Sequence, residues 1–157
     1  MRLPPIIVLS GPTASGKTAV ALRLAQHLNG EIVSADSRQV YRRMDIGTAK
    51  PTSEERRQVP HHMIDVVEPD EPYNAGIYAR QAREIVAAIV RRGCIPLVVG
   101  GSGLYIRALV DGFFEEVDAH PTVRETLRRE LAERGIEDLH AELVRSDPTT
   151  AARIHRK

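Results

Sequence analysis

The chain has 157 residues, of which 42% are hydrophobic and 27% are charged, and its 22 Lys and Arg nearly balance its 21 Asp and Glu. This composition excludes a disordered, collagen-like or low-complexity chain and predicts one globular core of ordinary domain size. A net charge of +1 indicates no strongly basic field for nucleic acid, although one face of a neutral protein can still be basic. The apolar run at 6–9 is only as long as a strand, so we expect neither a signal peptide nor a membrane span. The single cysteine, Cys94, fits a reducing, cytoplasmic setting.

Strand-like and helix-like patterns alternate along the first part of the chain. Short β-branched runs bounded by Gly and Pro indicate buried strands, and apolar residues three and four positions apart indicate helices. In chain order, we first expect a strand at 6–9 that is buried on both faces, and then a helix that begins at Lys17 and ends at Asn29 and Gly30. A second strand begins at 32–33, an irregular polar segment covers 38–60, and a third strand follows at 63–67. The last two elements of this part are a long helix capped by Asn74 and a strand at 95–99. The alternation predicts an α/β fold with a doubly wound parallel sheet.

The pattern changes in the last quarter of the chain, where no strand-like run occurs. Thr122 and Glu125 have the spacing of a capping box, and Gly135 ends the helix that they begin. Asp147 and Pro148 have the types expected of a cap and first helical residue. We therefore expect a core over residues 1–114 and the start of a separate helical subdomain over 115–157.

Residues 11–18 match GxxxxGK(S/T), the phosphate loop (P-loop) of ATP-binding proteins, between a predicted strand and a predicted helix. In such a loop the glycines let successive backbone N–H groups surround a di- or triphosphate, and the helix N-terminus adds positive charge. Lys17 would contact phosphoryl oxygens, and the Thr18 hydroxyl would bind Mg²⁺. The predicted diphosphate-binding residues are Gly11, Pro12, Thr13, Ala14, Ser15, Gly16, Lys17 and Thr18.

The strand predicted at 95–99 is followed by Gly100, Gly101, Ser102 and Gly103. Nucleoside triphosphatases usually place a magnesium-supporting aspartate at this position, and none is present here. Because ligands of open α/β sheets bind at the carboxyl edge, Ser102 is a candidate contact for metal or substrate. A hydroxyl that caps the helix starting near Leu104 is the alternative, and both roles can coexist.

Asp36 follows the second predicted strand, at the same edge of the sheet. A carboxylate there is placed to act as a general base, or it can bond to its own backbone as a turn aspartate. Arg38 and Gln39 follow directly. Arg38 can hold a phosphate and Gln39 can pair with the edge of a base, but a solvated charged loop would have the same composition.

Two further groups of residues have simpler interpretations. His61 and His62 are adjacent, so on a strand they point to opposite faces, and no partner stands at metal-ligand spacing. The tyrosines are too scattered for a stacking ladder and are interpreted as core or rim residues: Tyr41, Tyr73, Tyr78 and Tyr105.

Four segments together are more specific than a P-loop alone: residues 11–18, 34–41, 44–51 and 99–105. In this order and with these residues, the chain resembles the tRNA dimethylallyltransferase family, also called tRNA isopentenyltransferases. The resemblance implies a P-loop nucleoside triphosphatase-like fold whose phosphate loop holds dimethylallyl diphosphate. It also implies that N6 of an adenosine next to the tRNA anticodon attacks the allylic carbon and that pyrophosphate leaves.

The resemblance also implies residue roles. Asp36 corresponds to the general base, and Lys17 and Ser102 complete the catalytic set, with Ser102 standing where the family usually has threonine. The implied tRNA contacts are Asp36, Ser37, Arg38, Gln39, Ser102 and Arg124. The implied cofactor is Mg²⁺ at Thr18, and the implied partner is the anticodon stem-loop of tRNA, bound by a monomer whose helical tail corresponds to the family's insertion. Because family members are about twice as long, we expect this chain to be an N-terminal fragment.

Two other functions remain open at this stage. A small-molecule or nucleotide kinase would share the P-loop and an early substrate-binding acid. A tRNA-binding module without catalytic activity would share the basic residues alone.

Overall fold

The computed structural model describes residues 4–112 and 121–154. The chain divides into two compact units, Met1–Phe113 and Phe114–Lys157. The boundary that we predicted between 114 and 115 falls outside the described residues. In the described part of the chain, no helix is long and apolar enough to cross a membrane.

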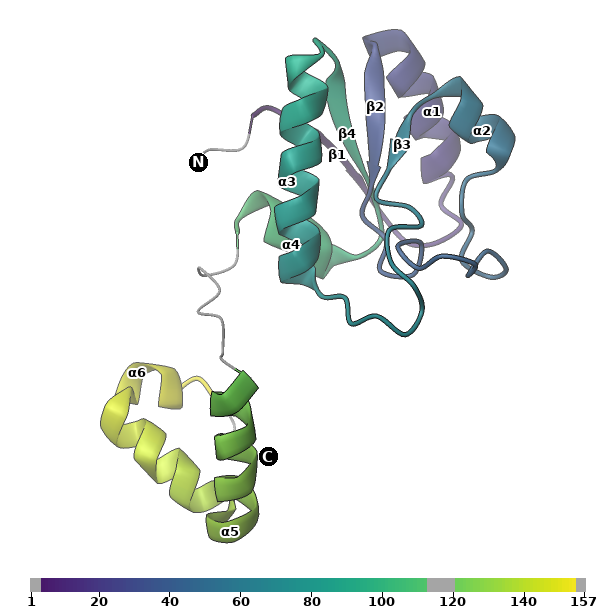
Figure 1. Cartoon of the computed structure of the whole chain (residues 1–157). Coiled ribbons are helices and arrows are strands. Elements are labelled where there is room, and N and C mark those ends of the chain that lie inside the picture. The colour runs from purple at the N-terminus through teal and green to yellow at the C-terminus, as the bar shows by residue number, and fades with distance from the viewer. Residues whose placement is uncertain (1–3, 113–120, 155–157) are drawn as a thin grey trace. The chain divides into compact units, whose positions relative to one another are not determined.

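A parallel sheet forms the centre of the first unit (Figure 1). Its strands are β1 (Ile7–Ser10), β2 (Gly30–Ser34), β3 (His61–His62) and β4 (Ile95–Gly100), in the spatial order β1-β4-β2-β3. β4 pairs with β1 from Leu97 to Gly100 and with β2 from Ile95 to Val99, so it is a central strand. The predicted α/β fold with a parallel sheet is confirmed.

Helices cover both faces of this sheet. α1 (Lys17–Leu28) packs against one face, and α3 (Ala75–Arg91) and α4 (Gly103–Val110) pack against the other (Figure 1). Successive residues of a strand point to opposite faces, so Ile32 belongs to the cluster under α1 and Val33 to the cluster under α3. The sheet is therefore doubly wound, as the sequence predicted.

The first strand is an edge strand, and the expectation that it is buried on both faces is wrong. Within the described residues β1 pairs with β4 alone, and alternate residues on one of its faces are exposed, with Val8 at 40%. A continuous apolar run is typical of a buried strand, but it does not show whether both faces are covered.

The segment between β2 and α3 also differs from the prediction. The third strand is His61–His62, paired with Ile32 and Val33, and it comes before the segment predicted at 63–67. Met63 and Asp65 have φ values of 62° and 57°, in the left-handed region, so the chain cannot run extended through them. The segment predicted as irregular contains α2 (Ser53–Gln58), which begins with a capping box between Thr52 and Glu55.

All secondary structure described in the second unit is helical. α5 (Pro121–Ser146) contains Gly135 with φ 81° and ψ 168°, so the continuous helix ends there, as predicted, and a second helical segment follows. α6 (Pro148–Ala151) begins after Asp147, whose side chain accepts a hydrogen bond from the Thr150 N–H at 2.9 Å. The predicted cap and first helical residue are confirmed.

Candidate active site

A cavity of about 890 Å³ opens at the carboxyl edge of the parallel sheet. Most of its lining comes from four segments that follow strand ends or border them, within residues 12–18, 34–39, 47–51 and 99–102. The loops after parallel strands meet at one edge of a sheet, and ligands of open α/β folds bind there. The fold thus brings together most of the candidate residues predicted from the sequence.

The phosphate loop forms one wall of this cavity. Lys17 is the first residue of α1, and its ammonium donates hydrogen bonds back to the Pro12 carbonyl and to the Ser15 hydroxyl. Gly16 has a φ of 80°, which is costly for a residue with a side chain, and this turn directs the chain into the helix. Pro12 through Thr18 line the cavity, whereas Gly11 lies just behind it. Loop amides, a helix N-terminus and a lysine together suit a diphosphate.

Thr18 supplies an oxygen that fits Mg²⁺. Its side chain lines the cavity, and within residues 4–112 and 121–154 its hydroxyl makes no hydrogen bond. Mg²⁺ usually takes one or two protein oxygens and fills its other positions with water and phosphate oxygens. The described part of the chain contains no group of three or more His, Cys, Asp or Glu that could hold a metal. The residues present therefore fit a magnesium ion that a bound diphosphate helps to hold.

Asp36 lies in the cavity wall directly after β2. Its Oδ1 accepts hydrogen bonds from the N–H groups of Arg38 at 2.8 Å and Gln39 at 3.3 Å, so it is a turn aspartate. Its other oxygen, Oδ2, has no hydrogen-bond partner among the residues that the structure describes. Because one oxygen holds the turn and the other is uncommitted, the turn role and proton acceptance are compatible.

Ser102 is tied to the Asp36 turn. Its Oγ accepts a hydrogen bond from the Ser37 N–H at 2.8 Å, and its own N–H donates to the Ala35 carbonyl at 3.1 Å. α4 begins at Gly103, and the Ser102 side chain makes no capping hydrogen bond to it. The alternative of a helix-capping hydroxyl is therefore wrong in this structure, because Ser37 uses that oxygen.

Gly100, the last residue of β4, has no room for a side chain. A Cβ added to Gly100 would lie 2.1 Å from the carbonyl oxygen of Ala35, a distance that no side chain tolerates. The backbone leaving β2 passes directly over the end of β4, so only glycine fits at this position. A carboxylate cannot be accommodated at Gly100 without moving this chain segment.

The two residues after Ser37 have different surroundings. The Gln39 side chain is bonded within the chain: its Oε1 accepts from Ser34 Oγ at 3.0 Å, and its Nε2 donates to the carbonyls of Thr48 and Ala49. The guanidinium of Arg38 is exposed and has no partner within the described ranges. Arg38 therefore remains available to a phosphate, whereas the Gln39 amide is already committed.

Arg124 belongs to the other unit. It is exposed on α5, and the residues that the structure describes offer it neither a hydrogen bond nor an ion pair. The predicted site residues thus fall into a set that lines the cavity and a single arginine on the helical unit.

Sequence analysis did not identify Lys50 and Asp65, which lie beside the cavity wall. The Lys50 side chain is only 4% exposed, and its ammonium donates to the Tyr41 carbonyl, Asp45 and Asp65 at 2.7, 2.8 and 2.7 Å. Burial alone would lower the pKa of Lys50, but the two carboxylates raise it overall. Lys50 lies in the segment 44–51, one of the four segments that carry the family resemblance. Its place in that segment is the feature of the sequence that could have identified it.

The tyrosines and the histidine pair lie as the sequence predicted. The rings of Tyr78 and Tyr105 stack on each other at 4.4 Å, with Tyr73 edge-on to Tyr105 at 6.3 Å. They are core residues, as predicted for the sequence, and burial raises the pKa of Tyr78 strongly. His61 lines the cavity, whereas His62 bonds to Glu31 at 2.6 Å.

Comparison with known proteins identifies the family. Residues 39–157 match the family described as IPP transferase. The chain belongs to this family. Among curated IPP transferase relatives, the chain is 55% identical to the tRNA dimethylallyltransferase of Koribacter versatilis over 99% of this chain and 50% of that one. It is 53% identical to the tRNA dimethylallyltransferase of Desulfotalea psychrophila, over 96% of this chain and 48% of the relative.

Solved structures agree with this assignment. The tRNA isopentenylpyrophosphate transferase of Bacillus halodurans matches with a TM-score of 0.69 and 42% identity, over 96% of this chain and 50% of that chain. A eukaryotic dimethylallyltransferase acting on tRNA matches with a TM-score of 0.84 and 31% identity, over 96% of this chain and 38% of that chain. The chain spans about half the length of the curated IPP transferase relatives that it matches.

Proposed function

We propose that the chain serves in the transfer of a dimethylallyl group from dimethylallyl diphosphate to N6 of an adenosine next to the tRNA anticodon, with release of pyrophosphate. The observation that carries this proposal is that the phosphate loop, Asp36 and Ser102 line one cavity. A diphosphate site and a carboxylate therefore lie within reach of one substrate pair. Membership of the IPP transferase family supports the same reaction class.

At the diphosphate end, the chemistry is stabilisation of a leaving group. As the allylic C–O bond breaks, negative charge grows on the departing pyrophosphate. Lys17, the loop amides and the N-terminus of α1 line the cavity where this charge would develop. Bound at Thr18, Mg²⁺ would add Lewis-acid stabilisation of the same oxygens.

At the nucleoside end, the chemistry is removal of a proton. When N6 bonds to the allylic carbon, the nitrogen becomes cationic and must lose one of its two protons. Oδ2 of Asp36 is the acceptor that we assign, because Oδ1 already holds the turn through Arg38 and Gln39. Ser102 fixes that turn through Ser37 and thereby keeps Asp36 in the cavity wall.

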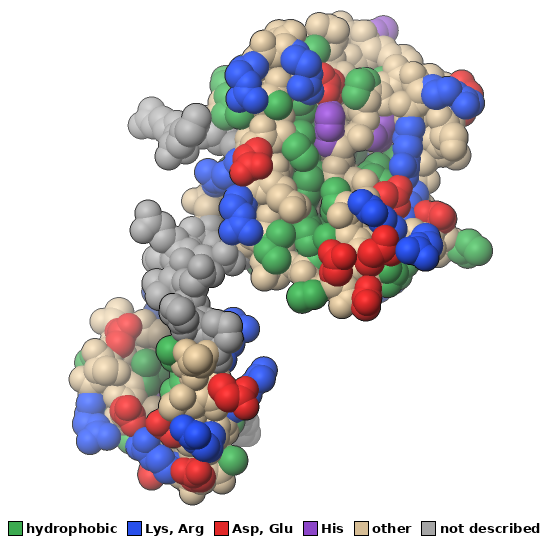
Figure 2. Space-filling view, in the orientation of Figure 1, with side chains coloured by type: hydrophobic (Ala, Val, Ile, Leu, Met, Phe, Trp, Pro, Cys, Tyr) green, Lys and Arg blue, Asp and Glu red, His purple; other side chains and the backbone are tan. Residues whose placement is uncertain are grey.

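The tRNA contacts are assigned to exposed arginines. Arg38 borders the cavity and Arg124 lies on the helical unit, and each has an uncommitted guanidinium within the described part of the chain. Figure 2 shows acidic and basic side chains interspersed over the visible face, so phosphate contact would depend on individual residues. The target adenine would have to leave its stack to reach the cavity. We further propose that the protein acts in the cytoplasm as a monomer.

A kinase is the second candidate, because it would use the same phosphate loop. The crowding of Gly100 against Ala35 speaks against it, because the usual magnesium-supporting aspartate has no room there. Nothing in the cavity favours the kinase over prenyl transfer.

The experiment that tests the proposal is incubation of the chain with labelled dimethylallyl diphosphate, Mg²⁺ and unmodified tRNA, followed by nucleoside analysis. Label in an N6-prenylated adenosine supports the proposal. A parallel calorimetric titration compares dimethylallyl diphosphate, pyrophosphate and ATP. Transfer or hydrolysis of the ATP γ-phosphate, with no binding of dimethylallyl diphosphate, would establish the kinase instead.

A further inference from the structure

The loop at residues 44–49 forms a second wall of the cavity, separate from the phosphate loop. Gly47, Thr48 and Ala49 line the cavity through this loop. Gly47 and Ala49 have φ values of 77° and 49°, a region that residues with side chains seldom adopt. Ile46, at the tip, is 100% exposed, so apolar packing does not hold the loop in place. Its conformation must be maintained by polar contacts.

Gln39 supplies one set of these contacts. Its Nε2 donates to the carbonyls of Thr48 at 3.1 Å and Ala49 at 3.0 Å, while its Oε1 accepts from Ser34 Oγ at 3.0 Å. One amide thus fastens the wall to the end of β2. Both donor hydrogens are used, so the same amide cannot also donate to the edge of a base without releasing the wall.

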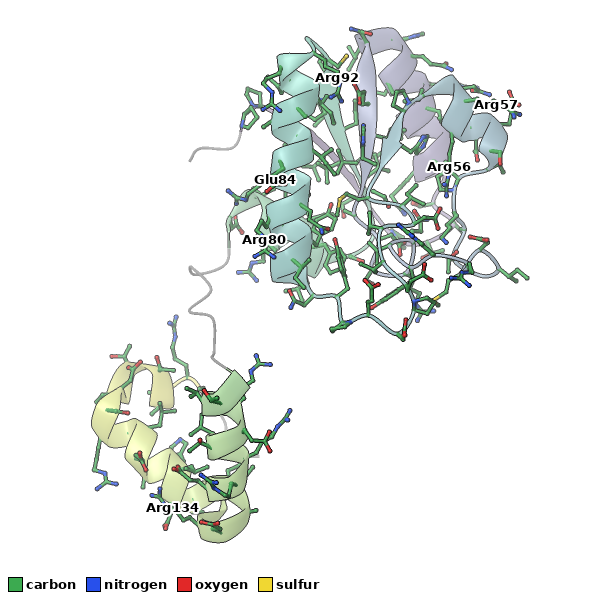
Figure 3. All side chains as sticks on the ribbon, in the orientation of Figure 1. Arg56, Arg57, Arg80, Glu84, Arg92 and Arg134 are labelled. Atoms are coloured by element: carbon green, nitrogen blue, oxygen red, sulfur yellow. The ribbon has the colours of Figure 1, made fainter. Side chains whose placement is uncertain are left out.

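Lys50 supplies a second set, in addition to the hydrogen bond that the Thr48 hydroxyl donates within the loop to the Met44 carbonyl at 2.6 Å. Its three donors are used by the Tyr41 carbonyl, Asp45 and Asp65, so the ammonium does not have a donor left for a diphosphate. Asp45 lies in the loop itself, and Asp65 also pairs at 2.9 Å with Arg56, which extends from α2 (Figure 3). Lys50 therefore connects the loop to the rigid body of the unit.

The cavity lining also includes apolar residues. Ala49 is one of them, and three larger ones are Ile32, Pro51 and Ile64. A phosphate loop needs charge and amides, whereas a hydrocarbon group gains from contact with apolar surface. The lining thus combines the phosphate loop with these four residues, which we call the apolar wall.

We propose that Gln39 and Lys50 are positioning residues that hold the wall at 47–49 against the hydrocarbon tail of the allylic diphosphate. The inference rests on the proposed function, because it takes an allylic diphosphate as the ligand. It gives Gln39 a role different from the tRNA contact implied by the family resemblance. Held in place by Gln39 and Lys50, this wall gives the cavity a higher affinity for a prenyl diphosphate than for pyrophosphate, because only the prenyl diphosphate has a hydrocarbon tail.

The test compares two ligands on the whole chain by calorimetry in Mg²⁺: inorganic pyrophosphate and dimethylallyl diphosphate. Gln39→Met keeps the length of the side chain and removes its hydrogen bonds. We expect Gln39→Met to weaken dimethylallyl diphosphate about 10-fold while pyrophosphate affinity stays within about 2-fold. Gln26→Met, an exposed glutamine on α1 outside the cavity lining, is the matched control and should change neither affinity.

A second measurement tests whether Gln39 and Lys50 hold the loop in place. Backbone NMR order parameters at residues 45–49 should fall in Gln39→Met, with β4 unaffected. Lys50→Met should show the same pattern more strongly, and if it fails to fold, Gln39→Met alone decides. Equal losses for both ligands, unchanged affinities, or unchanged order parameters at 45–49 would each overturn the proposal.

The wild-type chain separates this inference from the proposed function. Absence of pyrophosphate binding would contradict the phosphate-loop site and with it the proposed function. Binding of pyrophosphate as tightly as dimethylallyl diphosphate would leave the phosphate site intact and overturn the apolar wall alone.

Discussion

Ser102 Oγ accepts a hydrogen bond from the backbone N–H of Ser37 at 2.8 Å, joining the end of β4 to the turn that carries Asp36. The two residues are 65 positions apart in the chain. With Gly100 packed against Ala35, this contact fixes how the two central strand ends meet. The Ser102 hydroxyl thus has the Ser37 N–H as its hydrogen-bond partner at the cavity.

Ser102→Ala removes this contact. The Ser37 N–H lies near solvent, so we expect a loss of only about 0.5–1 kcal/mol in the free energy of unfolding. The rate of prenyl transfer should fall by more than this loss of stability alone would cause, because Ser102 no longer holds the turn that carries Asp36. Ser102→Thr keeps the hydroxyl and is the control; denaturant titration and single-turnover transfer are the measurements. Transfer by Ser102→Ala at the wild-type rate would argue against the anchor.

Lys17→Ala tests the phosphate loop. Loss of a charged hydrogen-bond donor should weaken pyrophosphate binding by about 1.5–3 kcal/mol, or roughly 10- to 100-fold. Arg23→Ala removes a positive charge from an exposed position of the same helix and should have little effect. Calorimetry in Mg²⁺ provides the affinities, and equal affinities for Lys17→Ala and wild type would rule out the assigned phosphate contact.

Asp36→Asn tests the proton acceptor. The amide oxygen can still accept from the Arg38 N–H, so the turn should persist while the ability to take a proton is lost. We expect prenyl transfer to fall by about 10²-fold or more and pyrophosphate affinity to stay unchanged. Asp70→Asn, at an exposed position outside the cavity lining, is the control. A parallel loss of binding and transfer would contradict the role of general base.

Arg124→Ala tests the tRNA contact on the helical unit. Removal of one phosphate-neutralising charge should lower tRNA affinity and reduce the slope of log K against log salt by about 1. Arg145→Ala, at an exposed position of the helical segment that follows Gly135, is the charge-matched control. Filter binding across a salt series measures the slope, and identical slopes for the two variants would remove Arg124 from the interface.

Glu31 provides a stability prediction with a defined pH dependence. It is 7% exposed, and its carboxylate bonds to Arg92 at 2.7 Å and to His62 at 2.6 Å. Arg92 directly follows α3 (Figure 3). The hydrogen bond from Arg92 is the main cause that lowers the pKa of Glu31 below its ordinary value of 4.5. The stabilisation is therefore present above pH 4.5 and is lost as pH falls through the lower folded-state pKa.

Glu31→Gln should accordingly cost about 1–3 kcal/mol at pH 7, and this difference from wild type should shrink in acid. Glu54→Gln breaks an exposed pair with Arg57 and should cost less than about 0.5 kcal/mol. Chemical denaturation at several pH values measures both. A Glu31→Gln deficit that stays constant down to pH 3 would contradict the lowered pKa.

Local features were predictable because their causes lie within a few residues. The phosphate loop, the Asn74 cap and the helix stop at Gly135 all depend on backbone torsions and hydrogen bonds between near neighbours. The strand error at 63–67 has the same scale: the apolar pattern there is strand-like, but left-handed torsions at Met63 and Asp65 interrupt the extended chain, and the segment forms an isolated bridge between Val67 and Tyr41 in place of a strand. The pattern of apolar residues alone does not show which backbone torsions those residues adopt.

Composition first indicated one ordinary globular core, and the sequence by itself determined more than that: the alternation of strands and helices, the phosphate-loop motif and the family. What only the tertiary structure decided were contacts between residues far apart in the chain. Ser102 anchors Ser37 where a helix cap was equally plausible, Gln39 fastens a loop where a base contact was implied, and Tyr78 stacks on Tyr105. The physical reason is that a side-chain hydrogen-bonding group can serve several partners, and packing selects which of them comes within reach.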